Sequence, residues 1–600
     1  MAVAKKKEQN LYLAKKVEIY DTSLRDGAQS EGISYSNTDK LAIIQRLDDL
    51  GVHFIEAGNP SSNPKDAEFF KELQSSKLEL KTAKIVAFGS TKKNNVLPAE
   101  DSGLKALLSA KTQRITIFGK SWDFHVLNVL NVSLNENITM IEDSVRYLTS
   151  KKRTVMFDAE HYFDGYKAKP DYALSTLKAA LGTGAEGVIL CDTNGGTFPD
   201  EVQRITRETK DALDKYILET NDGKKKFYFI GIHAHNDSDC AVANSIAAVQ
   251  GGATQIQGTL LGYGERAGNA ALTSVIPNLQ LKLGVKCIAD IKKITRVANE
   301  VGVISHYAVR DNTPYVGRSV FAHKAGMHAD AVAKNSNAFE QIAPEEVGNN
   351  RKFLISEHSG KAAVAQKISS ILTETPKDSP IVAAIVEKVK KMESEGYVFE
   401  SADASFELML RRETGEYEPY FELIDFKVVS SQIPNTDEVG VIKSIPSGAI
   451  VKVRVYDTTE ITADEGDGPV NAIDKALRKA LEIFYPDLKT TRLADYTVRI
   501  FDGDANTAAI TRVEIKMSNE YGNWTTVGAS KDIITASVIA LSEAWEYFLF
   551  KNGKENYHAN GLPDNFGEES PIEIIEEIEI ETDENETEIG TETETEENLK

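Results

Sequence analysis

Two short stretches of the chain carry side chains that could bind one metal ion together. His233-Ala234-His235 follows the apolar run 227–232, and Arg25-Asp26 follows the short strand-like run 17–20. Alternate side chains of a strand point to the same face, so the two histidines would project together, about 7 Å apart. Imidazole and carboxylate groups are common ligands of divalent cations. A His-x-His pair also occurs in cores and on surfaces, so the elements that carry it decide its meaning.

Length and composition indicate a multidomain globular protein. The chain has 600 residues, more than one hydrophobic core holds, so about two to four domains are expected. Its hydrophobic content of 41% and charged content of 27% are ordinary for globular proteins. No apolar run approaches the roughly 18 residues that span a bilayer, and the N-terminus lacks a signal-peptide core. We therefore expect a cytoplasmic protein without membrane contact.

Cysteine spacing and charge exclude further classes. The three cysteines have no CxxC spacing, so neither a disulfide framework nor a structural zinc site is indicated. The formal net charge is -22, and the segment 568–600, with fifteen acidic residues and one lysine, carries most of it. The remaining chain is mildly acidic, which is unfavourable for binding nucleic acid.

Eight short apolar runs alternate with helix-like segments such as 37–50 and 200–213, in which apolar residues recur at helical spacing. This alternation within roughly 250 residues predicts an α/β fold of the (β/α)8 TIM-barrel type, with the active site at the carboxyl ends of the strands. A doubly wound open sheet is the alternative, but it usually has fewer strands. The predicted strands are 17–24, 54–58, 85–89, 115–119, 155–159, 187–191, 227–232 and 255–260.

The barrel prediction brings polar residues to one rim, because each follows or ends a predicted strand. The first, seventh and eighth strands are contiguous in a closed barrel, so their terminal residues come from one arc about 10 Å wide. Two nitrogens and two oxygens from that arc could share one ion and leave positions open for substrate. These residues are Asp26 after strand one, His233 and His235 at the end of strand seven, and Asn269 after strand eight; Glu160, Asp192 and Thr193 lie at the ends of strands five and six.

The glycine-rich segment 262–269 precedes and includes Asn269. A phosphate-binding loop is one interpretation, but the segment lacks the lysine and Ser/Thr of a P-loop and follows the last strand instead of the first. We expect a tight rim loop that delivers Asn269.

The rest of the chain divides by composition and pattern. Segment 322–330 contains His323 and His328, which could belong to a lid over the rim or lie on the surface. We predict an N-terminal extension (1–16), the catalytic barrel (17–310), helical linker and lid subdomains (311–399), a C-terminal α+β domain (400–552) and an acidic disordered tail (553–600).

The predicted C-terminal domain contains a weak internal repeat. Strand-like 449–456 leads through glycines to the helix-like 470–483. Likewise, strand-like 511–516 and 525–527 lead through Gly528 to the helix-like 533–549. Helix N-termini bind carboxylates readily, so this pair could bind a small amino-acid effector. A plain dimerisation module is the alternative.

Three motifs resemble a known family. Asp-Thr-Ser-Leu-Arg-Asp-Gly-Ala-Gln (21–29), His-Ala-His-Asn-Asp (233–237) and Gly-Glu-Arg-Ala-Gly-Asn-Ala (264–270) are similar to the motifs of the α-isopropylmalate, homocitrate and citramalate synthases, which are barrel metallolyases. Segments 62–66, 87–91 and 116–123 are most similar to the (R)-citramalate synthase branch. The resemblance covers residues 15 to 550.

The resemblance implies an acyltransferase that condenses acetyl-CoA with pyruvate to give (R)-citramalate and CoA, the first step of a threonine-independent isoleucine route. It also implies a homodimer whose C-terminal domain binds isoleucine as inhibitor. A larger keto acid, as in isopropylmalate or homocitrate synthesis, is the alternative within the family. A non-catalytic, amino-acid-sensing protein on a barrel scaffold is the alternative outside enzymes.

The same resemblance implies roles for residues that match the family motifs. The metal would be Mn²⁺ or Mg²⁺, with Zn²⁺ as a further candidate. Phe339 is a departure, since relatives often have tyrosine there, so no role of a phenol hydroxyl is transferred. The implied roles are metal binding for Asp26, His233, His235 and Asn269; polarisation of the keto group for Arg25; proton transfer for Glu160 and His328; and lining of the keto-acid pocket for Asp158 and Thr193.

Overall fold

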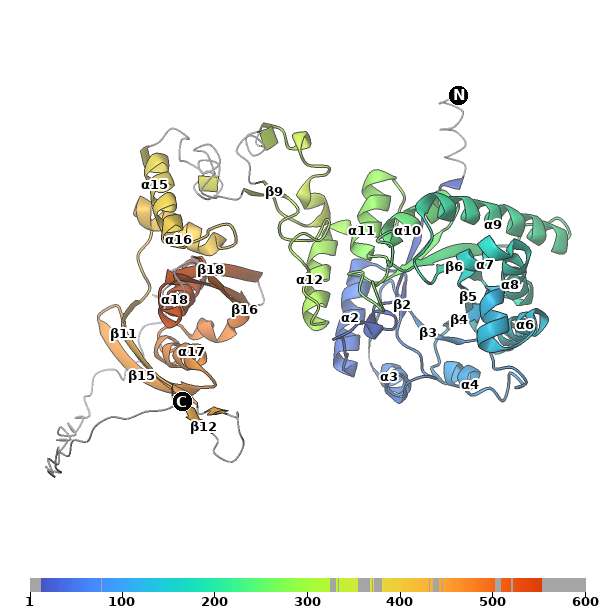
Figure 1. Cartoon of the computed structure of the whole chain (residues 1–600), viewed down its shortest axis with the longest axis horizontal. Coiled ribbons are helices and arrows are strands. Elements are labelled where there is room, and N and C mark those ends of the chain that lie inside the picture. The colour runs from blue at the N-terminus through green and yellow to red at the C-terminus, as the bar shows by residue number, and fades with distance from the viewer. Residues whose placement is uncertain are drawn as a thin grey trace, which may run out of the picture. The chain divides into compact units, whose positions relative to one another are not determined.

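The structure is a computed structural model, and its two compact units divide between Glu393 and Ser394. Each unit is described by itself (Figure 1). The described residues are 12–76, 78–323, 331–332, 334–353, 367–368, 371, 380–430, 432–434, 442–444, 446–501, 509–519 and 522–552. The predicted acidic tail and His328 lie outside them.

Eight parallel strands close into a barrel in sequence order, and β8 pairs with β1. The closure confirms the predicted TIM barrel and rules out the open sheet. The seventh strand begins two residues later than predicted and extends through His233 to Ala234. The strands are β1 (Glu18–Asp21), β2 (Phe54–Glu56), β3 (Lys84–Ser90), β4 (Arg114–Lys120), β5 (Thr154–Glu160), β6 (Gly187–Asp192), β7 (Phe229–Ala234) and β8 (Gln255–Gly258).

Helices surround the barrel, and local sequence sets their ends (Figure 1). Ser36 begins α2 with a capping box, since its side chain accepts from the Asp39 amide and Asp39 accepts from the Ser36 amide. Gly51 ends that helix in the left-handed conformation that glycine adopts without strain. The helices are α2 (Asn37–Leu50), α3 (Pro64–Ser75), α4 (Ser102–Ser109), α5 (Asp123–His125), α6 (Leu134–Ser150), α7 (Tyr162–Ala168), α8 (Pro170–Thr183), α9 (Pro199–Thr220), α10 (Ala241–Gln250), α11 (Leu272–Pro277) and α12 (Ile294–Ile304).

The barrel interior is filled with side chains and is not a pore. One apolar cluster inside it combines aromatic and aliphatic residues, all of them buried. Its members are Tyr20, Phe54, Val86, Met156, Ile189, Cys191 and Phe229.

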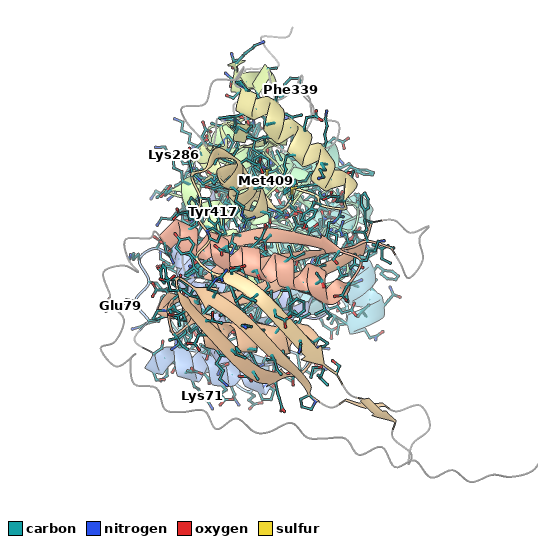
Figure 2. All side chains as sticks on the ribbon, turned by 90° about the vertical axis from the view of Figure 1, so that its left-hand side faces the viewer. Lys71, Glu79, Lys286, Phe339, Met409 and Tyr417 are labelled. Atoms are coloured by element: carbon teal, nitrogen blue, oxygen red, sulfur yellow. The ribbon has the colours of Figure 1, made fainter. Side chains whose placement is uncertain are left out.

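The described residues that follow the barrel in its own unit contain little regular structure. A two-residue strand β9 (Ala322–His323) pairs in parallel with β10 (Lys352–Phe353), and α15 (Pro380–Ser394) comes later. Phe339, where relatives often have tyrosine, is half-exposed in this segment (Figure 2).

The C-terminal unit has two three-stranded sheets of the same design, each followed by a helix that packs on it. The expected strand-then-helix repeat is therefore present, and both helices bury their apolar faces in one common core. Met409 lies on the helix that precedes the repeat (Figure 2). The elements are α16 (Asp403–Thr414), β11 (Glu422–Val429), β12 (Gln432–Pro434), β13 (Ile442–Ser444), β14 (Ser447–Val455), β15 (Thr458–Gly466), α17 (Pro469–Leu481), β16 (Arg492–Ile500), β17 (Thr511–Asn519), β18 (Gly522–Ser530) and α18 (Ile533–Asn552).

Helix α18 corrects one expectation from the sequence. Its 20 residues are long and apolar enough to span a membrane by length and composition, although we expected no such run. More than half of its most apolar stretch is buried within the unit, and Trp545 and Phe548 lie in the core beside the sheet. A core helix passes the same test of length and hydropathy as a membrane span.

Candidate metal-dependent active site

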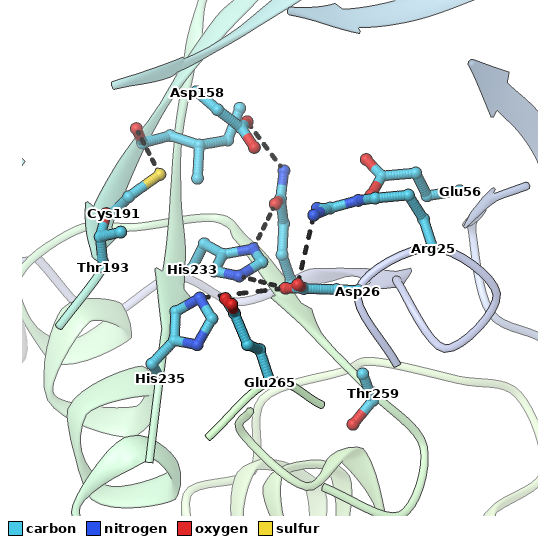
Figure 3. A network of polar contacts seen from close by, with 12 residues as sticks. Arg25, Asp26, Glu56, Asp158, Cys191, Thr193, His233, His235, Thr259 and Glu265 are labelled. Atoms are coloured by element: carbon cyan, nitrogen blue, oxygen red, sulfur yellow. Dashed lines mark hydrogen bonds and ion pairs between the residues drawn. The ribbon is translucent and has the colours of Figure 1, made fainter. Parts of the chain in front are cut away.

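Asp26, His233 and His235 converge at the carboxyl rim of the barrel (Figure 3). Their ligand atoms all lie within 4.8 Å of one another, and all three residues are buried. His233 Nε2 lies 3.0 Å from Asp26 Oδ2, and His235 Nε2 lies 4.0 Å from the same oxygen. The three side chains predicted from separate stretches of sequence therefore meet at one point.

The glycine-rich loop brings Asn269 beside His235. His235 and Asn269 form an isolated antiparallel bridge, and the Ala270 amide donates to the Ala234 carbonyl at 3.1 Å. The loop therefore runs alongside the end of β7. Gly268 has a φ of +90°, and a Cβ there would lie 2.1 Å from the Gly262 carbonyl oxygen, so this tight turn requires glycine.

Polar atoms without a hydrogen-bond partner at this point fit a cation-binding site. Buried polar atoms are nearly always hydrogen-bonded, and exceptions need an explanation. Among the described residues, Asp26 Oδ2, His235 Nδ1 and both amide atoms of Asn269 are buried without a hydrogen-bond partner. A carboxylate, two imidazoles and an amide oxygen are a mixed nitrogen and oxygen set that suits Mn²⁺, Mg²⁺ or Zn²⁺. The residues present thus fit a divalent metal.

Electrostatics keep Asp26 charged and His235 neutral, the states in which each can bind a cation. Burial disfavours the charged form of Asp26, but Arg25 and His233 outweigh it and hold the pKa of Asp26 well below its usual range. Burial, with His233 beside it, lowers the pKa of His235 to about 4, so this imidazole is neutral near pH 7. Burial opposes the charged form of His233 as well, yet Asp26 raises its pKa.

Arg25 is held from three sides. Its Nη1 lies 3.2 Å from Asp26 Oδ1, and its Nε donates to Glu56 Oε1 at 2.5 Å. The guanidinium carbon lies 3.9 Å from the centroid of the Phe88 ring, which adds a cation–π contact. A fixed positive charge therefore borders the convergence point of the three ligands.

Three of the four predicted ligands and four further predicted residues line a cavity of about 580 Å³. Glu160 forms an ion pair with Lys120 at 2.5 Å, and the two are register partners at the ends of β5 and β4. The Thr193 hydroxyl accepts a hydrogen bond from the His161 amide at 2.8 Å. Arg25, Asp26, Asp158, Glu160, Thr193, His233 and His235 all line this cavity.

Asp158 lies deeper in the barrel, almost completely buried. Burial raises the pKa of its carboxyl to about 7, while His233 opposes the increase. Its Oδ1 accepts a hydrogen bond from Gln257 Nε2 at 3.2 Å, and Gln257 Oε1 lies 2.8 Å from His233 Nδ1.

Three site residues were not predicted from the sequence: Glu56, Lys120 and Gln257. Glu56 and Gln257 are fully buried and lie at or next to the ends of β2 and β8. A charged or amide side chain inside an otherwise apolar strand is unusual, because burying an unpaired polar group is costly. That signal was available in Phe54-Ile55-Glu56 and Gln255-Ile256-Gln257, and it could have identified both positions.

Comparisons with known proteins agree with this architecture. The HMGL-like family matches residues 16–301, the homocitrate synthase post-HMGL domain-like family matches residues 315–396, and the LeuA allosteric (dimerisation) domain matches residues 400–549. The chain is 46% identical to an (R)-citramalate synthase of Aquifex aeolicus over 90% of its length and 99% of the relative's. The chain belongs to the (R)-citramalate synthase family.

A second member of the citramalate synthase family, from Synechocystis, is 47% identical over 88% of this chain and 96% of its own length. A probable 2-isopropylmalate synthase of Methanopyrus kandleri is 31% identical over 88% of this chain and 97% of its own length. The resemblance inferred from the motifs is thus confirmed. As a citramalate synthase family member the chain is a condensing acyltransferase, which rules out the non-catalytic scaffold.

Proposed function

We propose that this protein condenses acetyl-CoA with pyruvate and water to give (R)-citramalate and CoA. The observation that carries the proposal is an intact site in a chain of this family: Asp26, His233 and His235 converge beside Arg25 in one cavity. The higher identity to the citramalate synthases than to the 2-isopropylmalate synthase supports pyruvate as the acceptor.

Asp26, His233, His235 and Asn269 would hold a divalent cation at the rim. When bound, such a cation acts as a Lewis acid and a template for the keto acid. Asp26 supplies the negative charge, and the neutral His235 supplies a nitrogen lone pair.

Arg25 would stabilise the oxygen of the keto group as negative charge develops on it. Glu56 and Asp26 fix the guanidinium, so no reorientation is needed during the reaction. Preorganised charge of this kind is worth several kcal/mol in enzyme sites, about 3 kcal/mol for one well-placed donor.

A base must remove a proton from the methyl group of acetyl-CoA. We assign this proton transfer to Glu160 and His328, and Glu160 Oε2 lies at the cavity beside Lys120 Nζ. General-base assistance typically contributes about 10²- to 10⁴-fold. Thr193 and Asp158 would line the keto-acid pocket, and Thr193 keeps its hydroxyl hydrogen free to donate because its oxygen accepts from His161.

The C-terminal unit would make the protein a homodimer and bind isoleucine as feedback inhibitor. Two similar sheet-and-helix units and a match to the LeuA allosteric (dimerisation) domain support this part of the proposal. A cytoplasmic location and a role in isoleucine synthesis remain parts of the proposal.

The test is acetyl-CoA-dependent release of free thiol by the purified protein with Mn²⁺ or Mg²⁺. Pyruvate, 2-oxoisovalerate and 2-oxoglutarate are compared in parallel, with and without EDTA. We expect pyruvate to be preferred and EDTA to abolish release. A preference for 2-oxoisovalerate or 2-oxoglutarate would show that pyruvate is not the substrate. Full activity in EDTA would refute the metal site.

A further inference from the structure

We propose that Asp158 and Gln257 form a relay that sets which nitrogen of His233 carries the proton, and so prepares His233 as a metal ligand. This inference rests on the metal site proposed above. Asp158 would then have a second role besides lining the substrate pocket, and Gln257 would be a positioning residue.

The relay crosses the interior of the barrel. Gln257 is the register partner of His233 on the neighbouring strand β8, while Asp158 lies on β5, which pairs with neither β7 nor β8. Gln257 Nε2 donates to Asp158 Oδ1 at 3.2 Å, and Gln257 Oε1 lies 2.8 Å from His233 Nδ1. All three side chains are buried, and Gln257, which joins the other two, is completely so.

Each member of the relay orients the next one by hydrogen-bond chemistry. The Asp158 oxygen accepts, so the amide nitrogen of Gln257 turns toward it and the amide oxygen turns toward His233. An amide oxygen can only accept, so His233 Nδ1 carries the proton. Nε2 is then the nitrogen left to bind a cation, and it faces Asp26 Oδ2 at 3.0 Å (Figure 3).

The same strands provide a matched control one layer deeper. Gln255 and Met156 precede Gln257 and Asp158 by two residues, and Gln255 Nε2 lies 3.9 Å from Met156 Sδ. Gln255 is fully buried like Gln257, and no hydrogen bond joins it to His233. Replacing Gln255 therefore removes a buried amide from the same strand while leaving the relay intact.

The experiment titrates the metal-free full-length protein with Mn²⁺ and follows binding by calorimetry, without substrate. Partners of metal-binding histidines typically contribute 10- to 100-fold to metal affinity. We expect Gln257→Leu to weaken Mn²⁺ binding by about 10- to 100-fold, and Gln255→Leu to leave it near wild type. Circular dichroism verifies that each variant is folded.

A second pair of variants tests the direction of the relay and covers the case in which Gln257→Leu does not fold. Gln257→Glu places two carboxylates against each other and should weaken binding. Adding Asp158→Asn replaces one of the two carboxylates by an amide, whose NH₂ group can donate to the new carboxylate at position 257. That carboxylate still accepts from His233 Nδ1. We expect the double variant to recover most of the affinity lost by Gln257→Glu.

Wild-type affinity in Gln257→Leu, an equal loss in Gln255→Leu, or no recovery in the double variant would overturn the relay. A wild-type protein that fails to bind Mn²⁺ would instead overturn the proposed metal site, and the relay with it.

Discussion

Glu56 Oε1 accepts a hydrogen bond from Arg25 Nε at 2.5 Å, while Glu56 Oε2 accepts from the Tyr20 hydroxyl at 2.6 Å. The carboxylate is completely buried at the end of β2, where these two hydrogen bonds hold it. It fixes the arginine whose charge faces the proposed keto group. A residue inside the barrel wall thus prepares the surface of the cavity.

Removing the charge of Glu56 should lower activity more than stability. Hydrogen bonds to charged groups contribute about 1.5–3 kcal/mol, and each 1.36 kcal/mol is a tenfold rate effect. We expect Glu56→Gln to lower kcat/KM by about 10- to 100-fold. Thr116→Val is the control, because Thr116 contacts the same Tyr20 hydroxyl at 2.9 Å but does not touch Arg25. Equal losses in both variants would show that Glu56 acts only through Tyr20.

Replacing Asn269 should stabilise the metal-free protein and abolish its stabilisation by Mn²⁺. Its buried amide has no partner in the described part of the chain, and an unsatisfied buried polar group costs about 1–3 kcal/mol. Asn269→Leu should therefore raise the melting temperature of the metal-free protein. Mn²⁺ at 100 times its Kd should stabilise the wild type by about 2.7 kcal/mol but leave the variant unchanged.

Asn244→Leu is the matched control for that experiment. Asn244 is also buried, but its amide donates to Asp192 at 3.2 Å and to the Thr197 carbonyl at 2.7 Å. Its replacement should lower the melting temperature. A decrease in Asn269→Leu as well would contradict our assignment of the Asn269 amide as a ligand group.

His53 should make the barrel sensitive to acid. Burial, with Lys16 and Lys84 nearby, lowers its pKa to about 4, and its Nδ1 accepts from the Ile19 amide at 3.1 Å. The unfolded chain, with a histidine pKa of about 6.5, binds this proton first. The contribution of neutral His53 to the free energy of unfolding is therefore fully present above about pH 6.5, and it is lost as the pH falls from about 6.5 toward 4.

His53→Asn tests this pH dependence. Asparagine places an oxygen near the position of Nδ1 and can still accept from Ile19, but it does not titrate. We expect the melting temperature of the wild type to fall more than that of the variant between pH 7 and pH 5. The same pH dependence in both proteins would contradict the assignment.

The C-terminal unit depends on a buried carboxylate. Glu546 on α18 accepts hydrogen bonds from the Tyr417 hydroxyl and from the amides of Tyr420 at 3.1 Å and Phe421 at 3.3 Å. Glu546→Gln would face one of these donors with another donor, at a cost of about 1–3 kcal/mol. Unfolding in urea, followed by tryptophan fluorescence, should occur at lower urea concentration, because Trp524 and Trp545 both lie in this unit.

Ser542→Ala on the same helix is the control for Glu546→Gln. The Ser542 hydroxyl is buried and has no hydrogen-bond partner among the described residues, so its loss should be neutral or stabilising. A destabilisation as large as that of Glu546→Gln would show that the helix is sensitive to any change, and not to the carboxylate.

The sequence alone determined the barrel, because eight apolar runs alternated with helical periods at regular spacing. It also determined which residues reach the rim, since each follows a strand and parallel strands end at one face. Asp26, His233 and His235 were found this way, as was the strand-then-helix repeat after residue 400. The hydrophobic pattern in each case is local and can be read residue by residue.

Only the tertiary structure identified the partners inside the barrel. Glu56 beside Arg25, and Gln257 between Asp158 and His233, are contacts between residues 31, 99 and 24 positions apart. Such contacts depend on strand register and on which side chains face inward at the same depth of the barrel. A shift of one residue would turn each of them to the outer face. The candidate ligands could be inferred from strand ends, while the residues that contact and orient them could be identified only in the closed barrel.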